Sequence, residues 1–183
     1  MKATGIVRRI DDLGRVVIPK EIRRTMRIRE GDPLEIFTDR EGGVILKKYS
    51  PIGELNRFAG EYAESVHNIL GEGTLITDTD QVVAVSGVSK KEYMEKKLSP
   101  EIEEIIQDKK TRIVKENENP YPITGDDEGR TSYFSQIIVP IVSQGDAIGS
   151  VIVFSKEKGR LLGDIELRTA EVGANFLARQ MES

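Results

Sequence analysis

Five arginines near the N-terminus are the side chains of this 183-residue chain best suited to bind an anionic ligand. Arg8 and Arg9 are adjacent, Arg15 follows six residues later, and Arg23 and Arg24 form a second pair. A guanidinium group can hold a phosphate, or the edge of a guanine base, through two parallel hydrogen bonds. The group therefore predicts a surface that binds DNA, largely through its phosphates.

The distribution of charge supports this prediction. The whole chain has 27 Lys and Arg against 31 Asp and Glu, a net charge of -4. Residues 1–29 carry nine basic and three acidic side chains, a net of +6, which leaves -10 for residues 30–183. A basic segment on an acidic body indicates a nucleic-acid or anionic partner for the basic segment. A basic face that is merely solvated is the alternative.

Composition excludes several kinds of chemistry. The chain has no cysteine and one histidine, His67, which excludes zinc fingers, thiol nucleophiles, iron–sulfur clusters and disulfides. Neither a Walker A loop nor a G-x-G-x-x-G fingerprint occurs. Four aspartates have cation-binding chemistry, but turn formation is the favoured reading for them: Asp78, Asp80, Asp126 and Asp127. We therefore expect no cofactor, no metal site and no catalytic residues.

The elements that position the arginines are short. Turn residues and β-branched runs predict strands at 5–10 and 16–18 around a turn at 11–14, and a short helix over 20–26 after Pro19. Two further strands are predicted at 34–38 and 44–48. About 50 residues form a marginal domain by themselves. An intertwined homodimer would close the open strand edges and enlarge the core.

Residues 51–183 have the pattern of an α+β domain with an antiparallel sheet. Apolar residues at helical spacing predict helices over 52–70 and from 164 to 181, the second with Asp164 as its N-cap. Both apolar stripes fit packing onto their own sheet or association between helices. The other predictions are strands at 75–76, 81–85 and 111–115, helices within 90–110 with Ser99 as an N-cap, a loop at 117–130, and a hairpin of strands 136–142 and 147–155.

A resemblance adds to this reading. The segments DDLGRVVIPKEIRR and GDPLEI, within residues 1–50, resemble the AbrB-type swapped-hairpin DNA-binding domain. The resemblance implies an intertwined all-β barrel made by two chains. It also implies DNA contacts by Arg8, Arg15, Arg23 and Arg24, with Arg9 as a second-tier candidate.

The whole chain is similar to a family of forespore sporulation regulators that carry a C-terminal GAF domain, notably in KKYSPI, AVSGxSKKxY and FLARQME. This implies a swapped-hairpin DNA-binding domain at 1–50, a linker helix at 51–72 and a GAF-like regulatory domain at 73–183. It further implies a homotetramer built as a dimer of dimers, and activation and repression of sporulation genes. The expected location is the forespore cytoplasm, on the nucleoid.

GAF domains commonly hold a small ligand, so the sheet face under the 117–130 loop is a candidate pocket. The sequence carries no signature for that ligand, and it lacks a cysteine for bilin attachment.

Two other functions remain open at this point. An antitoxin would share the swapped hairpin, but it would join it to a short extended tail rather than to a patterned sheet such as 136–155. An enzyme would need acids that converge, whereas Glu103 and Glu104, like Asp126 and Asp127, are only adjacent in sequence.

Overall fold

The computed structural model describes residues 5–50, 52, 56–114, 118–127 and 133–181. The chain divides into two compact units, Met1–Tyr49 and Ser50–Ser183. Each unit is described by itself below.

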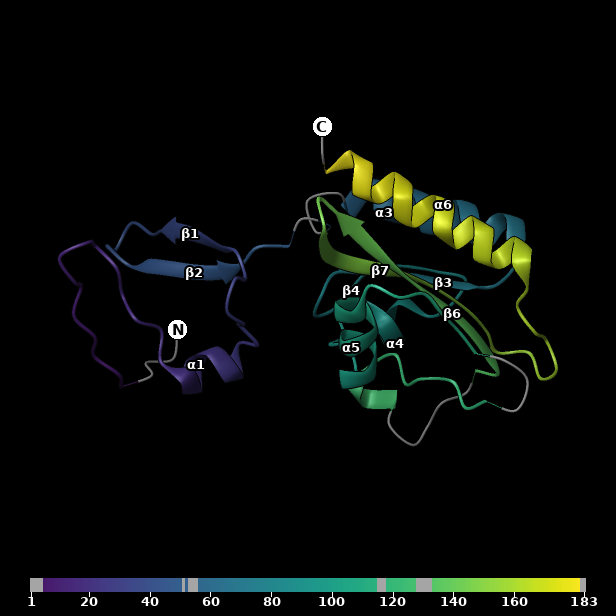
Figure 1. The fold of residues 1–183 in the computed structure, drawn as a ribbon, viewed down its shortest axis with the longest axis horizontal. Helices are drawn as coiled ribbons and strands as arrows, with labels where there is room; N and C mark the ends of the chain where they lie inside the picture. Colours follow the sequence, from purple (N-terminus) through teal and green to yellow (C-terminus); the bar gives the residue numbers. More distant parts are fainter. Residues whose placement is uncertain (1–4, 51, 53–55, 115–117, 128–132, 182–183) are drawn as a thin grey trace. The chain divides into compact units, whose positions relative to one another are not determined.

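Over residues 5–49, the N-terminal unit contains one short helix and one hairpin (Figure 1). Helix α1 spans Lys20–Thr25 directly after Pro19, and β1 (Leu34–Thr38) pairs antiparallel with β2 (Val44–Lys48). Asp39 closes the hairpin, because its Oδ1 accepts hydrogen bonds from the amides of Glu41 and Gly43. The predicted helix and this hairpin are confirmed.

The two strands predicted nearer the N-terminus are wrong for the single chain. Residues 5–10 and 16–18 form no strand, although the turn between them exists: the Asp11 amide donates to the Arg15 carbonyl and the Gly14 amide to the Asp11 carbonyl. A strand requires a ladder partner, and β1 and β2 pair with each other. Most apolar side chains of these segments are exposed, including Val7 at 89% and Val17 at 70%.

The C-terminal unit is a five-stranded antiparallel sheet with helices on both faces (Figure 1). Helices α3 (Asn56–Leu70) and α6 (Asp164–Gln180) cover one face, and α4 (Lys90–Tyr93) and α5 (Pro100–Asp108) lie on the other. The strand order is β4-β3-β7-β6-β5. The strands are β3 (Gly73–Thr77), β4 (Val82–Ser86), β5 (Arg112–Ile113), β6 (Ser135–Ser143) and β7 (Asp146–Ser155), and a 3-10 turn lies at Gly125–Asp127. The predicted α+β domain is confirmed.

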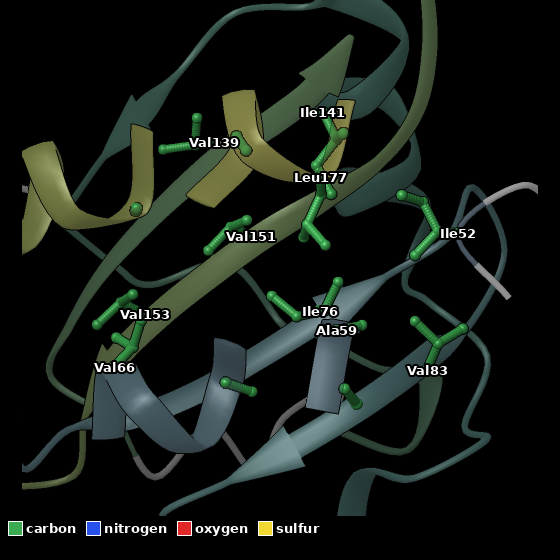
Figure 2. Close-up of a cluster of buried hydrophobic side chains, with 14 of the residues drawn as sticks. Ile52, Ala59, Val66, Ile76, Val83, Val139, Ile141, Val151, Val153 and Leu177 are labelled. Carbon is green, nitrogen blue, oxygen red and sulfur yellow. The ribbon is translucent and has the colours of Figure 1, made fainter. Parts of the chain in front are cut away.

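Alternation along the central strands builds two cores. Val151 and Val153 of β7 point into the core under α3 and α6 (Figure 2), whereas Ile152 and Phe154 enter the core under α4 and α5. This explains why the hairpin sequence is apolar at nearly every position. The helical stripes pack onto this sheet: Ala59 and Val66 of α3 and Leu177 of α6 are buried in the first core.

Some boundaries differ from prediction. The N-cap of α6 is Gly163 rather than Asp164, because the Gly163 amide donates to Glu166 Oε2 at 2.8 Å and Asp164 already belongs to the helix. The strand expected at 111–115 is reduced to Arg112–Ile113. Parts of three predictions lie outside the described residues: 53–55 of the helix at 52–70, residue 115 of the strand at 111–115, and residues 117 and 128–130 of the loop.

Candidate nucleic-acid interface

Arg15 lies at the end of the turn that joins the two extended N-terminal segments. Asp11 organises this turn: its Oδ1 accepts hydrogen bonds from the amides of Leu13 (3.0 Å) and Arg15 (2.8 Å). Gly14 adopts a φ of +76°, a backbone conformation that glycine reaches at little cost. The Arg15 side chain is 69% exposed, and its Nε donates to Asp11 Oδ2 at 2.7 Å. The turn therefore presents the guanidinium to solvent in a held position.

Arg23 and Arg24 occupy the last turn of α1, where positive charge complements the helix dipole. Arg24 is exposed and Arg23 is half-buried. The chain then turns back, with the Ile28 amide donating to the Arg23 carbonyl at 2.8 Å and the Ile28 side chain buried. Within the described part of the chain, Arg23 Nε is buried and has no hydrogen-bond partner. A buried N–H without a partner is costly.

Arg8 and Arg9 lie in the extended segment before the turn, and both are exposed. The four primary candidates thus occupy three separate segments of one chain. Only Arg23 and Arg24 are brought together by an element of that chain. Sequence reasoning treated Asp11 as a turn residue and missed its contact with the Arg15 side chain, for which an acidic residue four positions before an arginine was the available signal.

Of the four aspartates considered for a cation, Asp78 and Asp127 accept hydrogen bonds from turn amides, as predicted. Asp78 Oδ1 accepts hydrogen bonds from the amides of Asp80 and Gln81, each at 2.7 Å, and its Oδ2 accepts one from the Ser50 hydroxyl at 2.8 Å. Asp126 pairs with Lys96 at 2.9 Å. Across the described ranges, no three His, Asp or Glu side chains are grouped so that they could hold a metal ion.

His67, the single histidine, contacts the backbone just after α3. Its Nδ1 lies 3.0 Å from the Glu72 carbonyl oxygen, at the end of α3. The same ring borders an open hollow of about 570 Å³ beside the edge strand β4, whose lining also includes Glu64, Ser86 and Lys90. Sequence reasoning did not find this hollow, because its lining comes from segments that no motif connects.

The sheet face proposed for a ligand is packed with side chains. Phe154 lies in tilted contact with Tyr133, at 5.1 Å between ring centroids, and with Tyr93, at 5.7 Å. Tyr133 Oη accepts a hydrogen bond from the Ile123 amide (2.8 Å) and donates one to Asp127 Oδ2 (3.1 Å). Burial, together with the Asp127 charge, raises the pKa of Tyr133 well above its ordinary value. Among the described residues, a ligand on this face would have to displace these rings.

Helix α6 carries a second apolar stripe that the sequence analysis did not identify. Ile165, Val172 and Phe176 of α6 are 71%, 67% and 40% exposed. Phe176 also makes an edge-on contact with Phe58 of α3, at 6.4 Å between ring centroids. The available signal was their spacing of seven and four residues, which places all three on one side of a helix.

None of the helices in the described ranges combines the length and the apolar character that a membrane crossing requires.

Comparisons with known proteins match both units. Residues 54–182 match the family described as stage V sporulation protein T C-terminal, transcription factor, and residues 7–54 match antidote-toxin recognition MazE, bacterial antitoxin. The chain is 54% identical to stage V sporulation protein T of Bacillus subtilis over 182 residues, which covers 100% of this chain and 99% of that protein.

Partial matches agree with this. The chain is 65% identical over 51 residues to the transition state regulatory protein AbrB of the same bacterium, across 28% of this chain and 52% of that protein. The GAF domain of PixJ from Thermosynechococcus elongatus superimposes with a TM-score of 0.54 at 15% identity, covering 73% of this chain and 90% of that chain. The match to the PixJ domain shows that the C-terminal unit has a GAF fold.

The full-length match decides between a regulator and an antitoxin, because the N-terminal unit alone is compatible with both. An enzyme is likewise not supported, since the matching family consists of transcription factors. The chain belongs to the stage V sporulation protein T family of sporulation transcription factors, with an AbrB-type DNA-binding domain followed by a domain of GAF fold.

Proposed function

We propose that this transcription factor contacts duplex DNA through Arg8, Arg15, Arg23 and Arg24 of two intertwined chains, with Arg9 in a secondary role. The proposal rests on the exposure of apolar side chains in two N-terminal segments that lie in no strand. Residues 5–10 and 16–18 have strand-forming sequences and mostly exposed apolar side chains, yet they lie in no strand of the described chain. Pairing with the same segments of a second chain would bury Val7 and Val17 and would gather the arginines of two chains.

The second half of the proposal is a dimer of dimers. The exposed stripe Ile165, Val172 and Phe176 on α6 supports association of two C-terminal domains through their helices. A chain that pairs through a different surface at each end forms a homotetramer when the contacts close. Replacing Val172 with aspartate is expected to give a dimer where the wild-type chain gives a tetramer, as measured by sedimentation equilibrium. An unchanged mass would contradict this interface.

The proposed division of roles assigns DNA contact to residues 1–50, connection to the helix in 51–72, and oligomerisation and regulation to 73–183. Regulation by a small ligand would act through a site other than the packed face around Phe154 or through displacement of its rings. Membership in a family of sporulation transcription factors supports action on sporulation genes. Both activation and repression, and location in the forespore, are part of the proposal.

Arginine substitutions test the DNA contacts. Four arginines in each of two chains give eight contacts, so the slope of log K against log salt is expected to be on the order of -7. Arg15→Ala or Arg23→Ala removes two contacts per dimer and should make that slope less steep by up to about 1.8, with a large loss of affinity. Titration of a labelled duplex at several salt concentrations measures both.

Arg40→Ala is the matched control, because Arg40 is an exposed arginine in the β1–β2 turn and lies outside the proposed set. Its slope should stay at the wild-type value, and all variants should keep the wild-type mass. Wild-type affinity and slope in both Arg15→Ala and Arg23→Ala would overturn the assignment.

A further inference from the structure

Asp11 holds both the backbone and the side chain of Arg15. One carboxylate oxygen accepts from the Arg15 amide at 2.8 Å and from the Leu13 amide at 3.0 Å, and the other accepts from Arg15 Nε at 2.7 Å. The hydrogen bond from the Arg15 amide, followed by that from the Arg15 side chain, holds the pKa of Asp11 below its ordinary value. Asp11 therefore stays negatively charged beside a residue of a DNA-binding surface.

The contact occupies one side of the guanidinium. Arginine has five N–H donors, and the hydrogen bond to Asp11 uses the one on Nε. The end of the group formed by the two terminal nitrogens points away from this contact, and that end suits bidentate recognition of a guanine edge or of a phosphate. The turn thus restricts Arg15 to end-on contacts made from a fixed position.

The charge of Asp11 opposes general attraction to DNA. A carboxylate next to the phosphate backbone offsets part of the counterion release that an unpaired arginine would provide. This loss falls equally on every DNA sequence, whereas a fixed guanidinium favours sequences that offer an acceptor at the right place. The fixed position of Arg15 and the repulsion between Asp11 and the phosphates therefore both increase discrimination between DNA sequences.

We propose that Asp11 is a positioning residue that increases the selectivity of DNA binding by fixing Arg15 and weakening sequence-independent attraction. The inference rests on the proposed DNA contact of Arg15. It predicts that removal of the Asp11 charge strengthens binding to arbitrary DNA while it reduces the preference for selected sites.

Asp11→Asn in the full-length chain is the decisive variant, because the amide oxygen can still accept from the Leu13 and Arg15 amides while the charge is lost. The probes are a duplex selected from a random pool by the wild-type protein and a scrambled duplex of the same composition. Affinity for the scrambled duplex should rise severalfold, and its salt slope should become steeper, because the Asp11 charge no longer offsets the two Arg15 side chains. The ratio of the two affinities should fall about tenfold, as for loss of one good base contact.

Asp12→Asn is the matched control, since it makes the same charge change at the exposed neighbouring residue. A smaller effect in Asp12→Asn supports positioning, and an equal effect in both variants overturns it in favour of net charge alone. Equal loss of affinity for both duplexes in Asp11→Asn also overturns it, because a purely structural turn residue would behave so.

Arg15→Ala separates this inference from the proposed function. Undiminished DNA binding in Arg15→Ala refutes the contact on which the inference depends. If Arg15→Ala loses affinity for DNA as expected but Asp11→Asn keeps the wild-type ratio of affinities, the positioning role of Asp11 is refuted. The DNA contact of Arg15 is then still supported. In the Arg15→Ala background, Asp11→Asn should have no more effect than Asp12→Asn.

Discussion

Replacing Gly173 with alanine tests how α6 packs against α3. A Cβ atom at Gly173 would lie 1.9 Å from Cζ and 2.1 Å from the hydroxyl oxygen of Tyr62, distances that no real contact reaches. Tyr62 comes from α3, and its hydroxyl donates to the Thr169 carbonyl at 2.5 Å. Burial raises the pKa of Tyr62 to about 12. The ring must move away, and it loses its hydrogen bond when it does.

The size of the effect follows from opposing terms. Alanine is favoured over glycine in the middle of a helix by about 0.5–1 kcal/mol. Overpacking costs typically about 1–3 kcal/mol, and the lost hydrogen bond costs about 1 kcal/mol. We expect Gly173→Ala to lower the free energy of unfolding of the C-terminal unit by about 1–3 kcal/mol. Gly60→Ala is the matched control, because Gly60 lies in α3 and has nothing within 4 Å of its Cβ position, so it should stabilise by about 0.5–1 kcal/mol.

Tyrosine near-UV circular dichroism during urea unfolding of the full chain measures this effect. Four of the five tyrosines lie in Ser50–Ser183, so the signal reports mainly on that unit. In a Tyr62→Ala background the clash is absent, and Gly173→Ala should become neutral or slightly stabilising. An equal destabilisation in both backgrounds would refute the reasoning, as would a Gly173→Ala protein as stable as Gly60→Ala.

Two further predictions concern α5 and α6. Ser99→Ala should lower the free energy of unfolding in urea by about 1–2 kcal/mol, because the buried Ser99 Oγ accepts a hydrogen bond from the Ile102 amide at 3.2 Å and caps α5. Ser89→Ala is the control and should change the free energy of unfolding little, because the Ser89 side chain makes no cap hydrogen bond to α4. Burial alone would raise the pKa of Glu166, but the hydrogen bond from the Gly163 amide and the charge of Arg160 outweigh it and hold the pKa below the ordinary value of about 4.5. The ionised Glu166 side chain therefore stabilises the folded state above about pH 4.5. This stabilisation is lost as the pH falls through the lower pKa of the folded state. The thermal midpoint should therefore fall less between pH 5 and pH 3 in Glu166→Gln than in the wild-type chain.

Equal destabilisation by Ser99→Ala and Ser89→Ala would show that the cap contributes nothing specific. Parallel acid profiles for the wild-type chain and Glu166→Gln would show that the Glu166 carboxylate is not linked to folding.

Much of the fold could be predicted from local signals. The strands predicted at 34–38 and 44–48 coincide with β1 and β2, because turn residues fix a hairpin over a short distance. Ser99 caps α5 as predicted, since a cap depends on residues three positions apart. Two predicted strands failed because a strand also depends on pairing, and in the described chain β1 and β2 pair with each other while 5–10 and 16–18 lie in no strand.

The sequence predicted which residues form the candidate site, but it did not predict how all of them are arranged. The basic segment and the four arginines are visible as composition and motif, yet the contact of Arg15 with Asp11 depends on the conformation of the turn. The exposed stripe on α6 was hidden for a related reason. A helix with apolar residues on two sides can bury only one against its own sheet, and the sequence does not say which.

The sequence by itself determined the charge division, the local elements, the α+β class of the C-terminal unit and, through family membership, the role in transcription. Only the tertiary structure decided that Tyr62 meets Gly173, that Phe154 and its neighbours fill one face of the sheet, and that Val172 remains exposed. The physical reason is range. Hydrogen bonds within turns and helices join residues a few positions apart, whereas packing joins residues about a hundred positions apart, as in the Tyr62–Thr169 bond, and no local pattern encodes such a pair.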